Sequence, residues 1–143
     1  MRVRFAVLVT VAALTGCGGG DDAPQAPSYF NGTYTGALTK TQDTCFISGE
    51  YNGAAHVLRT EGSEVVVTIN TLVMRGVPND SGALEAVYES KSPSVTTRAI
   101  ARYATPVGTE PGASFNTTVT IQGIAHPSEF TCTLIFAGTV KRQ

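Results

Sequence analysis

The chain contains no tryptophan, and its 143 residues include only three cysteines and two histidines. The histidines, His56 and His126, are far apart and neither has the spacing of a metal site or a catalytic motif. The sequence has no Gly-x-Ser-x-Gly elbow and no glycine loop that would cradle a phosphate. Its carboxylates are scattered, with no pair that indicates acid–base chemistry. These absences predict no metal, no cofactor and no catalytic centre.

Basic residues are also few, with 10 Lys and Arg against 11 Asp and Glu. Such a balance lacks the positive patch on which nucleic-acid binding depends, so no nucleic-acid partner is expected. Long apolar runs are absent too. The run Phe5–Leu14 has ten residues, whereas a membrane-spanning helix needs about 20. This run is instead as long as the apolar region of a signal peptide.

What surrounds this run is specific. Arg2 and Arg4 precede it, and Leu14-Thr15-Gly16-Cys17 follows it. This order resembles the signal peptide and lipobox of bacterial lipoproteins. The resemblance implies that residues 1–16 are removed and that Cys17 carries the lipid that attaches the protein to a membrane. The alternatives are an ordinary signal peptide with an incidental cysteine, or a buried N-terminal strand.

The resemblance also implies a location in the bacterial envelope. Two or more acyl chains suffice for stable anchoring without further contacts between protein and membrane. In enterobacterial lipoproteins an Asp after the lipidated cysteine retains the protein at the inner membrane, and this chain has Gly18 there. We therefore expect attachment to the outer membrane. Without residues 1–16, eight basic and eleven acidic residues remain, which gives a net charge of −3.

Residues 17–28 are rich in Gly, Asp and Pro and have no apolar face to bury, which predicts a flexible linker. Residues 29–143 are long enough for one domain. Alternating apolar and polar residues between turn clusters predict strands throughout this domain. The expected strands are 30–40, 45–51, 54–60, 64–70, 83–89, 95–104, 114–122 and 130–140, with 71–77 as a further strand or a continuation. Asn52-Gly53 is a typical hairpin turn, and 41–44 and 123–128 are also expected to be turns.

No segment of the domain has a helical period, so the fold class is all-β with seven to nine antiparallel strands. Two architectures satisfy this pattern, a small up-and-down barrel and a two-sheet sandwich. With Cys17 lipidated, Cys45 and Cys132 remain as a pair for a disulfide in an oxidising compartment. The alternative is two unrelated buried thiols. A disulfide would bring the first and last strands together, which favours the barrel.

The opening Gly32-Thr33-Tyr34-Thr35-Gly36-Ala37-Leu38 resembles the first strand of lipocalin-like (calycin) barrels, which begins with a Gly-x-aromatic pattern. Tyr34 stands where that family usually has Trp. Inward-facing Tyr34, Leu38, Phe115 and Phe136 are candidates to line a site for a small apolar ligand. The alternative is that they fill the core, as is normal in a small barrel.

Arg98 and Arg102 lie on one face of a predicted strand, where they could clamp a carboxylate or phosphate. The alternative is a solvated outer face. Together these patterns predict a non-enzymatic envelope lipoprotein whose barrel binds a small apolar or amphiphilic ligand. A structural or protein-interaction module of the envelope is the alternative function, and an enzyme is the least favoured.

Overall fold

The computed structural model describes residues 23–46, 51 and 53–143. The predicted signal peptide, Cys17 and the rest of the first half of the predicted linker, 18–22, lie outside these residues. So do residues 47–50 of a predicted strand and Asn52 of the predicted hairpin turn. Within the described part of the chain, no helix has the length and apolar character to cross a membrane.

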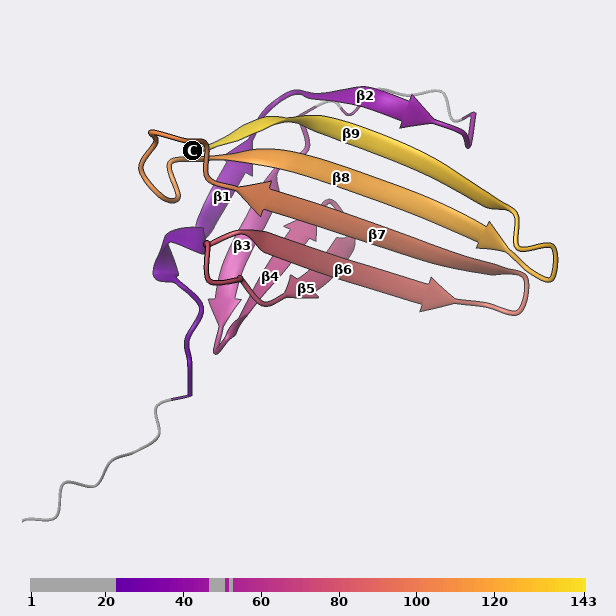
Figure 1. The fold of residues 1–143 in the computed structure, drawn as a ribbon, viewed down its shortest axis with the longest axis horizontal. Coiled ribbons are helices and arrows are strands. Elements are labelled where there is room, and N and C mark those ends of the chain that lie inside the picture. The colour runs from indigo at the N-terminus through magenta and orange to yellow at the C-terminus, as the bar shows by residue number, and fades with distance from the viewer. Residues whose placement is uncertain (1–22, 47–50, 52) are drawn as a thin grey trace, which may run out of the picture.

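The described residues form nine strands after one short 3₁₀-helix, η1 (Figure 1). Their bounds are η1 Ser28–Phe30, β1 Gly32–Thr35, β2 Leu38–Asp43, β3 His56–Glu61, β4 Glu64–Ile69, β5 Leu72–Gly76, β6 Leu84–Lys91, β7 Val95–Ala104, β8 Ser114–Ala125 and β9 Thr131–Arg142. The predicted all-β class is therefore confirmed. The segment 71–77, left open in the sequence, forms a strand of its own that pairs with β4.

The strands form one antiparallel sheet in the order β1-β3-β4-β5-β6-β7-β8-β9-β2, and β1 also pairs with β9. This last pairing closes eight strands into a barrel. β2 is the extra strand, and it lies along β9 beyond β1, with Leu38 opposite Gly138. The closed up-and-down barrel is the predicted architecture, and the two-sheet sandwich is not formed.

Glycine makes two close approaches in the barrel. A Cβ atom on Gly76, at the end of β5, would overlap the carbonyl oxygen of Glu85 in β6. A Cβ atom on Gly36, between β1 and β2, would overlap the carbonyl oxygen of Thr139 in β9. Figure 1 shows β6–β9 as long strands, with the shorter β1, β3, β4 and β5 crossing them. The two glycines lie where these strand groups meet, at sharp corners that require close backbone contact.

Several predicted boundaries are wrong. The expected single strand 30–40 is broken at Gly36, where the backbone passes close to Thr139. The expected turn 41–44 is strand as far as Asp43, because β9 provides pairing partners for Gln42 and Asp43. Turn-forming residues thus take part in a ladder when a long partner strand lies beside them.

The predicted turn 123–128 begins later than expected, since β8 continues to Ala125 opposite β7 and β9. Cys45 was expected to begin a strand and instead lies in a bend. Its N–H donates to the Oδ1 atom of Asp43 at 3.1 Å, a local turn that ends β2. From this bend the sulfur of Cys45 lies at bonding distance from that of Cys132 on β9, with 4.8 Å between the Cα atoms.

The core lies inside the barrel and follows the predicted alternation. On β4, Val65, Val67 and Ile69 are buried, as are Ala99, Ala101 and Tyr103 on β7. Phe30 of η1 closes one end of the barrel, where it stacks on Phe115 with 5.4 Å between ring centroids.

Candidate functional site

The four side chains expected to line a ligand site lie in the core. Tyr34 and Phe115 are 0% exposed, and Leu38 and Phe136 are 5% and 6% exposed. The ring centroids of Tyr34 and Phe115 are 5.0 Å apart, and Phe136 packs against Tyr51 at 5.2 Å. All four belong to one cluster of packed apolar side chains. They pack as core residues do.

A polar network, which sequence reasoning missed, lies within this core. His56, at the start of β3, is fully buried. Its Nδ1 atom is 2.7 Å from the hydroxyl oxygen of Tyr103 on β7, and its Nε2 atom is 2.8 Å from that of Tyr51. The sequence places His56 on a strand but contains no local signal for this network, because its members come together only when the barrel closes.

The burial of the network determines where its protons lie. Burial lowers the pKa of His56 to about 4, so the imidazole is neutral and has one donor and one acceptor nitrogen. The hydroxyl of Tyr103 is buried and has no other hydrogen-bond partner among the described residues. It therefore donates to Nδ1. The N–H at Nε2 then donates to Tyr51, which is only partly buried.

Both tyrosines of the network stay protonated at neutral pH. Burial raises the pKa of Tyr51 to about 12, and burial, together with the nearby Tyr51, raises the pKa of Tyr103 well above its usual range. Every ring nitrogen of His56 is occupied by a phenol. The arrangement is that of a satisfied polar network that ties β3 to β7.

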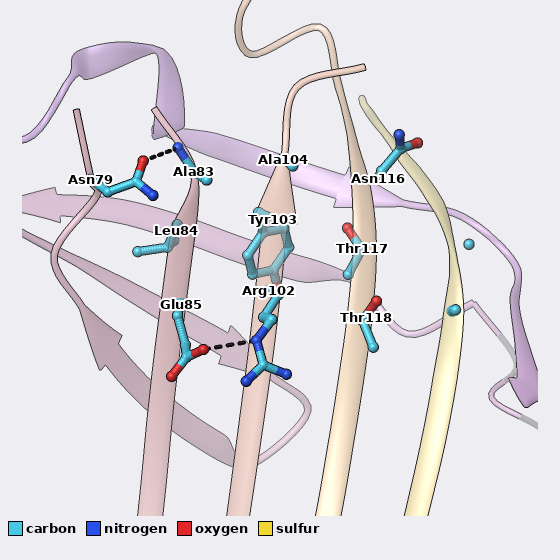
Figure 2. A pocket seen from close by; sticks show the side chains of 12 residues that line it. Asn79, Ala83, Leu84, Glu85, Arg102, Tyr103, Ala104, Asn116, Thr117 and Thr118 are labelled. Atoms are coloured by element: carbon cyan, nitrogen blue, oxygen red, sulfur yellow. Dashed lines mark hydrogen bonds and ion pairs between the residues drawn. The ribbon is translucent and has the colours of Figure 1, made fainter. Parts of the chain in front are cut away.

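A groove of about 480 Å³ lies on the outer wall of the barrel, over β6–β9 and the loop before β6 (Figure 2). Its exposed lining includes Glu85, Arg102, Ala104 and Asn116, which point away from the core. The full lining is Asn79, Ala83, Leu84, Glu85, Arg102, Tyr103, Ala104, Asn116, Thr117, Thr118, Ala137 and Gly138.

Small residues on neighbouring strands leave room for this groove. Ala104, Ala137 and Gly138 carry little or no side chain, so the backbone is accessible between larger neighbours. At one side Arg102 donates through Nε to the Oε2 atom of Glu85 at 2.7 Å, and both side chains are about half exposed. Figure 2 shows this ion pair between β6 and β7, with Asn116 and Thr118 on β8. The groove thus combines small apolar surface with a polar rim.

The structure separates the two arginines expected to form a clamp. Arg102 lines the groove and is paired with Glu85, whereas Arg98 lies opposite Glu89 in the register and is not part of the lining. The Nε atom of Arg98 is buried, without a hydrogen-bond partner among the described residues. The two guanidinium groups therefore do not converge on one anion. Arg102 is exposed on the outer wall, as the alternative of a solvated face predicted, whereas Arg98 is only partly exposed.

His126 lies in the predicted turn 123–128 and is exposed, and its Nε2 atom lies 2.9 Å from the hydroxyl of Thr96. In the ranges that the structure describes, no group of three His, Cys, Asp or Glu side chains is placed to hold a metal ion.

Comparison with known proteins identifies no relative of this chain. No family model matches the chain, and neither a curated protein nor a solved structure matches it significantly.

Proposed function

We propose that this chain is a non-enzymatic lipoprotein of the bacterial envelope, held at the outer membrane through Cys17. In this proposal its barrel binds a small amphiphilic molecule, and the binding site is the outer-wall groove, not the interior. The anchor rests on the resemblance of Leu14-Thr15-Gly16-Cys17 to a lipobox.

The groove is the observation that supports this binding site. Its volume of about 480 Å³ is within the range of roughly 300–1,000 Å³ typical of small-molecule sites. Ala104, Ala137 and Gly138 offer apolar surface, while the Glu85–Arg102 pair and Asn116 offer hydrogen-bond donors and acceptors. An amphiphilic molecule matches both. The core aromatic residues, by contrast, are packed against one another inside the barrel.

Native mass spectrometry of the protein purified from its own host tests the groove. We expect an additional bound mass in the natural chain. Ala137→Phe, which fills the groove, should lose this mass. Thr131→Phe, on the same face of β9 but outside the groove, should keep it. An unoccupied natural chain, or equal occupancy in both variants, would contradict the proposed site.

The anchor has a separate test. Labelling cells with radioactive palmitate should mark the natural chain and leave Cys17→Ala unlabelled. An unlabelled natural chain would contradict the lipoprotein assignment while leaving the groove untouched.

The second candidate function is an interaction module. It is favoured by the edge of β6 from Glu89 to Lys91, which has no pairing partner among the described residues and is not part of the groove lining.

A further inference from the structure

Although the barrel is closed, the edge of β6 that faces β5 is paired over only part of its length in the described residues. Every residue of β6, from Leu84 to Lys91, pairs with β7. On its other side β6 pairs with β5 at one position, Val87 opposite Arg75. Figure 1 shows β6 continuing past the end of β5, with no strand drawn along that part of its outer edge. Among the described residues, the edge from Glu89 to Lys91 is therefore unpaired and exposed.

The direction of the backbone groups along this edge follows from one contact. The carbonyl oxygen of Glu85 points toward β5, since a Cβ atom on Gly76 would overlap it. β6 pairs with β7 without a register shift, so backbone groups alternate sides along it. The N–H and C=O groups of Glu89 and Lys91 consequently point to the open edge. An edge of this kind is a template for an added strand.

We propose that this edge pairs with the same edge of a second copy of the chain. The proposal does not depend on the groove or its ligand. Two β6 strands related by a two-fold axis at Ser90 would run antiparallel and place Glu89 of each copy opposite Lys91 of the other. Both residues direct their backbone groups outward, so each such pair is a hydrogen-bonded pair with two backbone bonds.

Charge complementarity favours a second copy of the chain as the partner of this edge. Glu89 and Lys91 lie on the same face of β6, and within one chain their side chains form an ion pair at 2.8 Å. Across the two-fold axis the same two side chains meet as opposite charges in both pairs, which stabilises antiparallel strands. The offset also separates the two barrels, because position 87, where β5 meets β6, comes opposite Pro93 in the turn of the other copy. The resulting contact is small and self-complementary, as in a two-fold dimer.

A single added cysteine tests the axis in the full chain. In a non-hydrogen-bonded antiparallel pair the Cα atoms are about 4.5 Å apart, so Ser90→Cys should form a disulfide-linked dimer under a mild copper–phenanthroline oxidant. Ser81→Cys, also exposed and in the loop before β6, is the matched control and should remain monomeric. Crosslinking of Ser90→Cys no stronger than that of Ser81→Cys would overturn the proposal, as would a crosslink to a different protein.

Charge reversals test the register without relying on a thiol. Glu89→Lys or Lys91→Glu alone places like charges opposite each other in both pairs, and should weaken self-association about tenfold in sedimentation. The double variant Glu89→Lys/Lys91→Glu restores opposite charges and should recover the natural affinity. An equimolar mixture of the two single variants should form a heterodimer. Equal effects of the single and double variants would overturn the proposed pairing, and circular dichroism checks that each variant is folded.

Discussion

The Nδ1 atom of His56 lies 2.7 Å from the phenolic oxygen of Tyr103, and this buried hydrogen bond joins β3 to β7. The imidazole is fully buried and neutral, and its Nε2 atom forms a second hydrogen bond, with the hydroxyl of Tyr51. The network makes stability sensitive to acid and to the loss of a single hydroxyl group.

Acid should destabilise the barrel through His56. Its pKa is about 4 in the folded chain against about 6.5 when unfolded, so only the unfolded state binds the proton between these values. The neutral imidazole contributes about 3 kcal/mol to the free energy of unfolding above pH 6.5, and this contribution is lost as the pH falls to 4.

Denaturant titrations of the natural chain and His56→Gln between pH 7 and pH 4 measure this effect. The difference in unfolding free energy between them should shrink as the pH falls. His126→Gln, an exposed control, should follow the natural chain. A difference that does not change with pH would contradict the buried neutral imidazole.

Removal of the Tyr103 hydroxyl should cost more than removal of the Tyr51 hydroxyl. Tyr103→Phe leaves a buried imidazole nitrogen without its donor, at a cost of about 1–3 kcal/mol. Tyr51 is partly exposed, so water can replace its hydroxyl in Tyr51→Phe. Thermal unfolding compares the two variants. Nitrogen NMR of the natural chain should find the ring proton of His56 on Nε2, and a proton on Nδ1 would reverse the assigned direction of both bonds.

Gly76→Ala should destabilise the corner between β5 and β6. The added methyl group would overlap the carbonyl oxygen of Glu85, a backbone atom that cannot rotate away. We expect a loss of about 3 kcal/mol, at the upper end of the usual cost of overpacking. Gly123→Ala is the matched strand control, because its nearest neighbour is the sulfur of Cys132 at 3.4 Å. Equal unfolding free energies for the two variants would refute a requirement for glycine at this corner.

Loss of the disulfide should destabilise the chain strongly. Cys45 and Cys132 are 87 residues apart, and closing so long a loop stabilises by roughly 4–5 kcal/mol in the chain-entropy model. Cys45→Ser/Cys132→Ser should therefore unfold at a much lower denaturant concentration than the natural chain. Peptide mapping without reductant should recover the two cysteine peptides as one linked species. Two free thiols in the natural chain would contradict the pairing.

Sequence reasoning predicted the strands well where alternation is regular. The bounds of β7 coincide with the predicted 95–104, and Phe115 on β8 and Phe136 on β9, expected to face inward, are buried. It was wrong around residues 36–45, where turn residues and an alternating run compete. There the course of β9 decides which residues pair, and local composition carries no information about a strand almost a hundred residues later.

The candidate sites, like the strands, could be predicted from the sequence only in part. Tyr34, Leu38, Phe115 and Phe136 were recognised as inward-facing from alternation alone, and they are buried. The sequence could not show whether these side chains fill the interior or line a cavity, because filled and hollow barrels have the same alternation of apolar and polar residues. The groove was missed, since its small residues look unremarkable on any single strand and form a depression only when β6–β9 lie side by side.

The sequence by itself determined the all-β class, the inward faces of most strands and the expectation of a lipid anchor, because each depends on residues a few positions apart. Only the tertiary structure decided barrel closure, the His56 network, the outer groove and the open edge of β6. Each of these depends on which distant strands become neighbours. The cysteines belong to both levels: the sequence predicted that Cys45 and Cys132 pair, and the fold decided that the bond holds a bend beside β9.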